Sequence, residues 1–240
     1  MIAVQEAKSI IQKRIPLLGT EIVSLHDAGN RVLAQDIVAT FPLPRFDNSA
    51  MDGFAVRAAD TADAGKNNPV MLKMIGGVSA GDPGDLVLES GECAQCMTGA
   101  PIPQGSDAVV MVEDTSGYDS GETVEIYLEA YPGKHIRRRG DEIAQGDVLI
   151  QKKTRITPAE LGTLATFGYS RVRVYRAPKL ALVATGDELI KPGQPLKPGQ
   201  IYNSNLFVFS DLAKRAGAEI TMEEIVADDT KALHAFLSQA

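Results

Sequence analysis

Four short strings of polar and glycine residues could carry chemistry, and the first is NSAMDG at residues 48–53. Small and polar residues there precede an Asp-Gly pair, and Phe54 begins a run of strand-forming residues. Asp-Gly is a strong hairpin signal, so a plain turn would explain this string. The alternative interpretation is that Asp52 is a carboxylate presented at the rim of a cleft.

The second string is TGAPIP at residues 98–103, where a predicted strand ends at a hydroxyl residue. Gly99 permits close approach of the backbone, and the two prolines fix the path of the exit. Such a loop can offer the Thr98 hydroxyl and free amides to an anion. A loop stiffened by proline can equally well serve only to connect two strands, so both interpretations stay open.

The third string, KHIRRRGDEI at residues 134–143, is the only strong basic cluster in an acidic chain. The acid pair Asp141 and Glu142 follows the arginines at once. Charge runs are usually solvated faces. Against that interpretation, three arginines can hold phosphates, and adjacent carboxylates can hold a divalent cation that bridges them.

The fourth string, LVATGDEL at residues 182–189, lies where a predicted strand of an α/β sheet ends. Ligands of open α/β sheets bind outside the carboxyl ends of the strands. Asp187 and Glu188 would be available there for Mg²⁺ or for acid/base chemistry beside a phosphate, unless TGDE only caps the next segment. Asp228 and Asp229 follow the next strand, so four carboxylates would gather at one rim and favour a functional site.

The elements that would position the first three strings are short strands. Between residues 47 and 136, alternating or β-branched runs are separated by Gly, Asp and Pro, which is typical of an all-β module. Before this module, helical spacing of apolar residues predicts a helix over residues 3–14, and prolines 42 and 44 stiffen a linker. The predicted strands cover residues 54–57, 70–75, 93–97, 108–113 and 123–128.

Helical patterning returns at Thr157, where Thr157, Pro158 and Glu160 predict a capping box and Gly168 ends the helix. A strand is expected over residues 171–175.

From residue 178 onward the pattern reads β, α, β, α. The predicted elements are a buried-type strand at 179–185, a helix that Asn203 to Asn205 can cap and Gly217 ends, a strand at 219–226, and a last helix. Such a unit favours a parallel sheet covered by helices on both faces, and two strands are fewer than the roughly five of an average sheet. The chain is therefore expected to be a fragment.

Composition excludes several classes of function. Lys and Arg number 24 against 31 Asp and Glu, which gives a net charge of −7 and a pI near 5.1, so nucleic acid is not expected as a partner. No apolar run approaches the roughly 18 residues of a membrane span, and no signal peptide opens the chain, so we predict a cytoplasmic protein. Cys93 and Cys96 show neither zinc-ligand nor redox context and are interpreted as ordinary thiols.

Together the strings resemble one known family. NSAMDGFAV at 48–56, TGAPIP at 98–103, RRRGDEI at 137–143, and ATGDEL at 184–189 followed by IYNSN at 201–205 resemble, in order and spacing, the molybdopterin molybdenumtransferases, MoeA and the gephyrin E domain. The resemblance covers all 240 residues.

The resemblance implies a multidomain α+β fold. It comprises a helical linker domain with an inserted all-β domain, followed by the start of a three-layer α/β molybdopterin-binding domain. The implied boundaries are 1–45 and 138–177 for the linker and dimerisation domain, 46–137 for the β domain, and 178–240 for the incomplete binding domain.

The activity that the resemblance implies belongs to molybdenum cofactor biosynthesis. It is insertion of molybdate into adenylylated molybdopterin with Mg²⁺-dependent release of AMP, by a homodimer for which the molybdopterin adenylyltransferase is a candidate partner. This chain would be inactive by itself, because it ends before the family's later phosphate loop, its molybdate-contacting residues and its barrel domain. The alternative is a non-catalytic dimeric binding or scaffold module of the same family.

Carried over by motif, the resemblance also assigns site residues. The catalytic set is Asp52, Thr98, Glu142 and Glu188. The cofactor-binding set is Ser49, Gly186, Arg137, Arg138, Asn203 and Ser204. The metal set is Asp187, Glu188, Asp228 and Asp229. Which carboxylate faces the cleft stays open for the pair Asp141 and Glu142 and for the pair Asp228 and Asp229.

Overall fold

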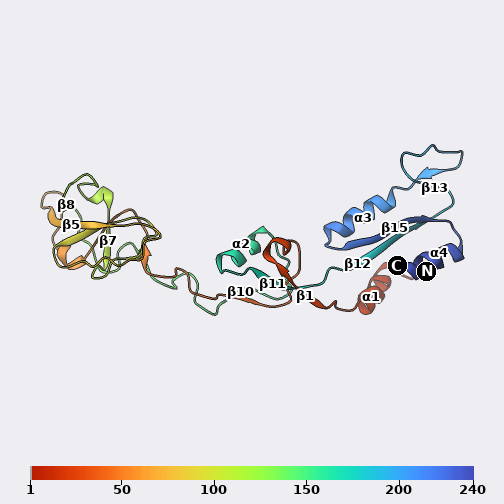
Figure 1. The fold of residues 1–240 in the computed structure, drawn as a ribbon, viewed down its shortest axis with the longest axis horizontal. Helices are drawn as coiled ribbons and strands as arrows, with labels where there is room; N and C mark the ends of the chain where they lie inside the picture. The colour runs from red at the N-terminus through yellow and green to blue at the C-terminus, as the bar shows by residue number, and fades with distance from the viewer. Residues whose placement is uncertain (1) are drawn as a thin grey trace. The chain divides into compact units, whose positions relative to one another are not determined.

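The structure is a computed structural model that describes residues 2–240. The chain divides into two units, which we call unit 1 (Met1–Ile37 with Leu149–Ala240) and unit 2 (Val38–Val148). Unit 2 is thus a continuous insertion between the two segments of unit 1, as the colours along the ribbon show (Figure 1). Two short strands, β2 (Ile37–Val38) and β10 (Val148–Ile150), pair where the chain enters and leaves the insertion.

Unit 2 is built on a five-stranded sheet in the order β7-β4-β6-β5-β8. β4 is antiparallel to both β6 and β7, whereas β5 is parallel to β6. Aromatic and β-branched side chains suit a pleated surface, and Phe54, Val56 and Val110 lie in the core that they form. The predicted strand-rich module is confirmed. Its strands are β3 (Asn48–Ser49), β4 (Gly53–Val56), β5 (Val70–Val78), β6 (Glu92–Cys96), β7 (Ala108–Met111), β8 (Thr123–Ile126) and β9 (Ile136–Arg137), with a short 3-10 turn η2 at Ala58–Thr61.

One predicted strand is shorter than expected. The run at 108–113 was predicted as a single strand, but β7 ends at Met111 and a 3-10 turn, η3 (Val112–Asp114), follows it. The amide of Val112 donates to the Asp52 carbonyl at 3.1 Å, and the Thr115 amide donates to the Val112 carbonyl at 3.1 Å. These bonds bend the chain and place η3 beside the start of β4.

The first part of unit 1 packs a helix against a two-stranded sheet. β1 (Thr20–Ser24), followed by the 3-10 turn η1 (Leu25–Asp27), pairs antiparallel with β11 (Arg171–Tyr175). Leu164 of α2 (Pro158–Thr166) lies in the core with Leu33, Ile156 and Val172. The predicted first helix is confirmed as α1 (Val4–Arg14), and none of its residues is buried. Among residues 2–240, no helix has the length and apolar character needed to cross a membrane.

The start of α2 confirms the capping box predicted from sequence. The Thr157 hydroxyl oxygen accepts a hydrogen bond from the Ala159 amide at 3.3 Å, and the Glu160 carboxylate accepts one from the Thr157 amide at 2.9 Å. Gly168 ends the helix with a φ of +75°, a conformation that glycine adopts at little cost. Local side chains therefore determine both ends of α2.

We expect the substitution Thr157→Ala to weaken α2. An N-cap hydroxyl replaced by a methyl group costs about 1 kcal/mol, because first-turn amides lose their acceptor. Amide hydrogen exchange in α2 should accelerate by about fivefold, the factor that corresponds to this free energy. The matched control is Thr166→Ala at the last residue of the helix, which should leave exchange in the first turn unchanged. Equal exchange in both variants would contradict the capping role of Thr157.

The second part of unit 1 has the β, α, β, α order expected from the sequence. β12 (Lys179–Thr185) and β15 (Glu219–Val226) pair in parallel, and α3 (Asn205–Arg215) contacts both strands. Two short parallel strands, β13 (Leu189–Ile190) and β14 (Ile201–Tyr202), lie between β12 and α3 in the chain. The Asp229 carboxylate caps α4 (Thr230–Gln239) by accepting from the Ala232 amide at 3.0 Å.

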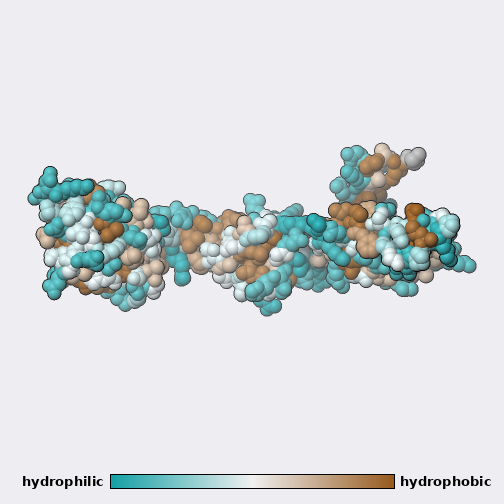
Figure 2. Space-filling model, turned by 90° about the horizontal axis from the view of Figure 1, so that it is seen from above, coloured by the Kyte–Doolittle hydropathy of each residue, from teal (hydrophilic) through white to brown (hydrophobic). Residues whose placement is uncertain are grey.

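The expectation that residues 179–185 form a buried strand is wrong. No residue of β12 is buried, because β15 is its only paired neighbour among residues 2–240. The apolar side chains of α3 are also exposed, with Phe207, Phe209 and Leu212 each more than half exposed. Apolar side chains, drawn in brown, are accordingly visible at the surface in Figure 2.

Candidate functional site

Three of the four sequence strings meet in unit 2. Residues Asn48 and Ser49 of β3 pair with Arg137 and Ile136 of β9. The Ser49 amide donates to the Ala100 carbonyl at 3.0 Å, and the Gly99 amide donates to the Ser49 carbonyl at 2.9 Å. We call this arrangement the motif junction, which comprises residues 48–52, 98–100 and 135–139. It joins segments that are far apart in the sequence.

Asp52 and Thr98 form the exposed side of the motif junction. The Thr98 amide donates to Oδ1 of Asp52 at 2.7 Å, and both residues are exposed. This backbone hydrogen bond holds the pKa of Asp52 below its ordinary value. Asp52 is therefore an ionised, oriented carboxylate at neutral pH, suited to accept hydrogen bonds or hold a cation. The two interpretations of the first string are therefore compatible: β4 begins at Gly53, and the preceding Asp52 is exposed at the surface.

Ser49, expected to bind cofactor, lies beneath this surface. Its side chain is buried, and its hydroxyl donates to the Met51 carbonyl at 2.5 Å. That bond supports the bend that brings Asp52 to the strand start. A binding role for Ser49 stays a prediction.

The basic string is organised by one carboxylate that the sequence interpretation missed. Asp47 accepts from the Arg138 guanidinium at 2.6 Å and from the Arg139 amide at 2.8 Å. The Arg139 amide is the largest cause that lowers the pKa of Asp47, and the Arg138 side chain adds to it. Arg138 is thus held by an ion pair, whereas Arg137 is exposed and has no ion pair within residues 2–240.

The two acidic residues after the arginines, Asp141 and Glu142, make different contacts. Oδ2 of Asp141 accepts from the Arg138 amide at 2.8 Å and so closes the turn of this segment. Glu142 donates its amide to the Leu43 carbonyl at 3.0 Å, and its side chain is exposed. Glu142 is therefore the carboxylate with more freedom to reach a ligand.

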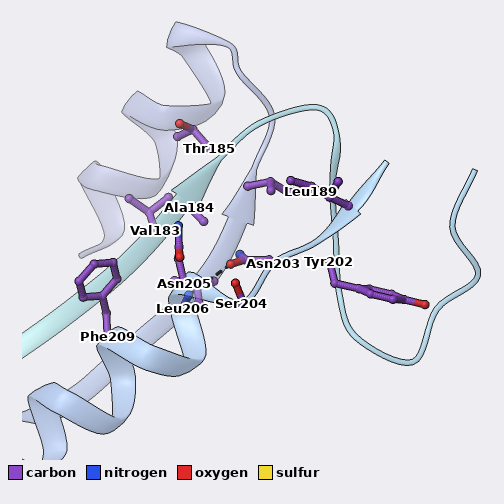
Figure 3. Close-up of a pocket in the computed structure, with 11 residues that line it drawn as sticks. Val183, Ala184, Thr185, Leu189, Tyr202, Asn203, Ser204, Asn205, Leu206 and Phe209 are labelled. Carbon is purple, nitrogen blue, oxygen red and sulfur yellow. Dashed lines mark hydrogen bonds between the residues drawn. The ribbon is translucent and has the colours of Figure 1, made fainter. Parts of the chain in front are cut away.

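The fourth string lies in unit 1, beside a pocket of about 250 Å³ (Figure 3). The end of β12 and the start of α3 form its walls, with Thr185, Ser204 and Asn205 among the polar lining residues and Phe209 among the apolar ones. The first amides of a helix have no acceptor within the helix and favour anions. The Ser204 side chain makes no cap hydrogen bond here. The pocket therefore combines an apolar wall with hydrogen-bond donors.

Asn203 fixes the start of α3 and leaves a buried donor. It is only 3% exposed, and its Oδ1 accepts from the Leu206 amide at 3.2 Å. Its Nδ2 is buried and has no hydrogen-bond partner among the described residues. Buried polar groups are nearly always paired, so this unpartnered amide is an exception among the described residues.

The segments that follow β12 and β15 meet at the end of the parallel sheet, whereas the gathering of four carboxylates there stays a prediction. Oδ1 of Asp187 accepts from the Asp228 amide at 3.2 Å. The side chain of Glu188 folds over Gly186, where an added Cβ would lie 2.7 Å from Oε2 of Glu188. Asp229 caps α4 instead. Within residues 2–240, no group of three or more His, Cys, Asp or Glu side chains is placed to hold a metal ion.

The two cysteines are buried thiols, as interpreted from the sequence. Burial raises the pKa of Cys93 to about 12 and that of Cys96 to about 11. Neither is a nucleophilic thiolate at neutral pH.

The fold is that of a multidomain α+β protein. A strand-rich unit is inserted into a second unit, and that second unit ends in a parallel α/β part with a pocket at its strand ends. The chain matches the family model of the MoeA N-terminal region (domain I and II) over residues 2–168. Residues 181–240 match the model of a probable molybdopterin binding domain. The chain belongs to the MoeA family, and the resemblance stated from its motifs is confirmed.

Relatives of known sequence and structure agree with this assignment. A molybdopterin molybdenumtransferase 2 of Mycobacterium tuberculosis is 39% identical over 239 residues, which is 100% of this chain and 58% of the relative. The molybdopterin molybdenumtransferase of Bacillus subtilis is 43% identical over 201 residues, 83% of this chain and 47% of the relative. A crystal structure of the molybdopterin biosynthesis protein MoeA from Pyrococcus horikoshii has a TM-score of 0.89 at 32% identity, and the match covers 100% of this chain and 64% of that chain.

These comparisons confirm the expected fold class, with MoeA domains I and II followed by the start of the binding domain. The chain spans about half to three-fifths of the length of the curated relatives it matches. These two curated relatives are named as molybdopterin molybdenumtransferases. The residue roles and the four implied domain boundaries stay predictions.

Proposed function

We propose that this chain supplies the substrate-recognising part of an enzyme that inserts molybdate into adenylylated molybdopterin and releases AMP. The observation that carries the proposal is the pocket at the start of α3, which is lined by Asn203, with its unpartnered Nδ2, and by Ser204, whose side chain makes no cap hydrogen bond. Phosphate groups bind at helix N-termini because amide donors and the helix dipole favour them. Phe209 and Leu206 line the same pocket and could pack against the pterin ring.

The residues present also fit a magnesium ion. Mg²⁺ is commonly held by one or two carboxylates with substrate phosphates and water completing its shell, so a cage of three protein ligands is not required. The Asp228 amide donates to Oδ1 of Asp187, which brings the two residues to one edge of the sheet, and we assign the ion to this pair, with Glu188 as a neighbouring residue in the sequence. When bound, Mg²⁺ would neutralise phosphate charge as AMP leaves. Asp229 is excluded from our ligand set because it caps α4.

The motif junction and the nearby residue Glu142 have a complementary role in this proposal. Asp52 and Glu142 provide exposed carboxylates, Thr98 a hydroxyl beside Asp52, and Arg137 a cation without an ion pair for an oxyanion such as molybdate. The proposed enzyme is a cytoplasmic homodimer that receives its substrate from the molybdopterin adenylyltransferase. Its proposed domains are the linker and dimerisation domain (1–45 and 138–177), the β domain (46–137) and the incomplete binding domain (178–240).

The test uses two proteins. In the first, adenylylated molybdopterin is titrated into the 240-residue chain by calorimetry, and saturable, Mg²⁺-dependent binding is expected. The second is a chimera in which the carboxy-terminal part of the Mycobacterium tuberculosis relative follows Ala240, and it should release AMP when molybdate is added. Absence of binding by the chain would overturn the proposal. Binding by the chain without AMP release by the chimera would favour a scaffold module.

Within the chimera, Asp228→Asn should lower the rate of AMP release by about tenfold to a hundredfold, since a metal ligand is lost. Asp229→Asn is the matched control, because asparagine caps a helix as well as aspartate does, and its rate should stay near wild type. The reverse order of effects would assign the metal to Asp229.

A further inference from the structure

His135, in the basic string, has a left-handed backbone conformation that few residues other than glycine adopt. Its φ is +56°, and the two residues of β9 follow it directly. Histidine is among the side chains enriched in this conformation, which still costs free energy for any residue with a Cβ. Such backbone strain persists only where surrounding contacts determine it, and it is concentrated at functional sites. The contacts that hold His135 therefore indicate its role.

The ring of His135 is bonded to the five-stranded sheet. β7 is the first strand in the order of that sheet, and its Val109 lies opposite Ala55 of β4. The Val109 amide donates to the Lys134 carbonyl at 3.0 Å, and Nδ1 of His135 lies 3.1 Å from the Val109 carbonyl oxygen. A carbonyl oxygen can only accept, so Nδ1 carries the proton of this hydrogen bond. Lys134 and His135 thus pair both backbone groups of Val109.

The backbone of His135 is bonded to the first string. Its carbonyl oxygen accepts from the Ala50 amide at 2.8 Å. Ala50 follows β3, which pairs with β9 so that Asn48 lies opposite Arg137, and it precedes Asp52 by two residues. His135 therefore connects β7 through its ring with the bend before Asp52 through its carbonyl.

These contacts form a closed circuit through the motif junction. Asp52 leads into β4, and β4 pairs with β7. The His135 ring then connects β7 to the start of β9, and Arg137 of β9 lies opposite β3, which leads back to Asp52. The position of Asp52 relative to Arg137 depends on each of these contacts, and His135 contributes one of them through its side chain.

We propose that His135 is a positioning residue, whose ring holds β9 on β7 and thereby fixes Asp52 and Arg137 relative to each other. Charged and polar groups that are held in place before a ligand arrives stabilise it more, because they need no reorganisation. The inference rests on the roles proposed above for Asp52 and Arg137, but its test needs no substrate.

The experiment compares His135→Gly with His135→Asn in the 240-residue chain. Glycine and asparagine both adopt the left-handed conformation, but only asparagine keeps a donor nitrogen at the place of Nδ1. In His135→Gly, hydrogen exchange of the Ala50 amide should accelerate by about fivefold, the factor for one lost hydrogen bond. The pKa of Asp52, measured by carbon-13 NMR titration, should rise by about 0.5 because the loosened bend weakens its bond from the Thr98 amide. His135→Asn should resemble wild type in both measurements.

The matched control is Asp63→Gly, at another left-handed residue of unit 2 with a φ of +60°. It should leave the Ala50 amide and the Asp52 titration unchanged. The positioning role would be overturned if His135→Gly behaved like wild type, if the asparagine variant behaved like the glycine variant, or if Asp63→Gly produced the same changes.

A measurement on the wild-type chain covers the case in which His135→Gly does not fold. Nitrogen-15 NMR of the neutral His135 ring should place the proton on Nδ1, and a proton on Nε2 alone would overturn the proposal. Protonated Nδ1 and rescue by asparagine, together with a wild-type chimera that releases no AMP, would support the positioning role and reject the proposed activity.

Discussion

Replacing Gly53 with alanine is expected to unfold the sheet of unit 2. Gly53 lies in β4 between Cys96 of β6 and Met111 of β7. A Cβ at this position would lie 2.0 Å from the Val110 carbonyl oxygen and 2.9 Å from the Met111 Cα. Both are backbone atoms of a paired strand, so relief requires β4 and β7 to separate. The cost should exceed about 3 kcal/mol, the upper range for overpacking.

Amide hydrogen exchange in β4, β6 and β7, together with denaturant unfolding followed by circular dichroism, measures this effect. The control is Gly65→Ala in the same unit, where no atom lies within 4 Å of the added Cβ and the backbone is not left-handed. That variant should be neutral or up to about 1 kcal/mol more stable, because alanine restricts the unfolded chain. Equal stability of the two variants would show that β4 does not approach β7 so closely.

Short-range patterns in the sequence were sufficient to predict where the helices form. The capping box at Thr157 was predicted and is present, because its partners lie three residues apart. The β, α, β, α order with a parallel strand pair was also predictable, and the chain after each strand does meet at one edge, where the Asp228 amide donates to Asp187. Burial of β12 was not predictable in this way, since it depends on which strands and helices cover the sheet.

The contacts within the motif junction could not be predicted from local sequence patterns. Its strings were recognised one by one, but the pairing of β3 with β9 and the bond from Thr98 to Asp52 connect distant residues. Asp47 was missed although it directly precedes the NSAMDG string, because its ion pair with Arg138 spans 91 residues. A search for an acid able to balance three consecutive arginines could have found it. His135 belongs to a recognised string, but its ring bonds to a carbonyl 26 residues away, which no local pattern indicates.

The second large effect is expected at Asp52. In the chimera, Asp52→Asn should lower AMP release by about a hundredfold or more, the scale on which an oriented charge or a general base acts. Asparagine keeps an oxygen that can accept from the Thr98 amide, so the motif junction should persist while the charge is lost. The rate is measured with saturating molybdate and Mg²⁺. Asp119→Asn is the control, because it removes the same charge from an exposed position in the same unit.

The pH dependence of stability measures how much the charge of Asp52 contributes to the stability of unit 2. The pKa of Asp52 is lowered in the folded chain, so the stability it contributes is present above the ordinary value of 3.8 and is lost as the pH falls through the folded pKa. Asp52→Asn should therefore reduce the acid sensitivity of unit 2 below pH 3.8 and leave its pH dependence near neutrality unchanged.

The outcome that would contradict a catalytic role is release of AMP by the Asp52→Asn chimera at the wild-type rate. Asp52 would then be only a residue of the bend before β4, as the hairpin interpretation of its string holds.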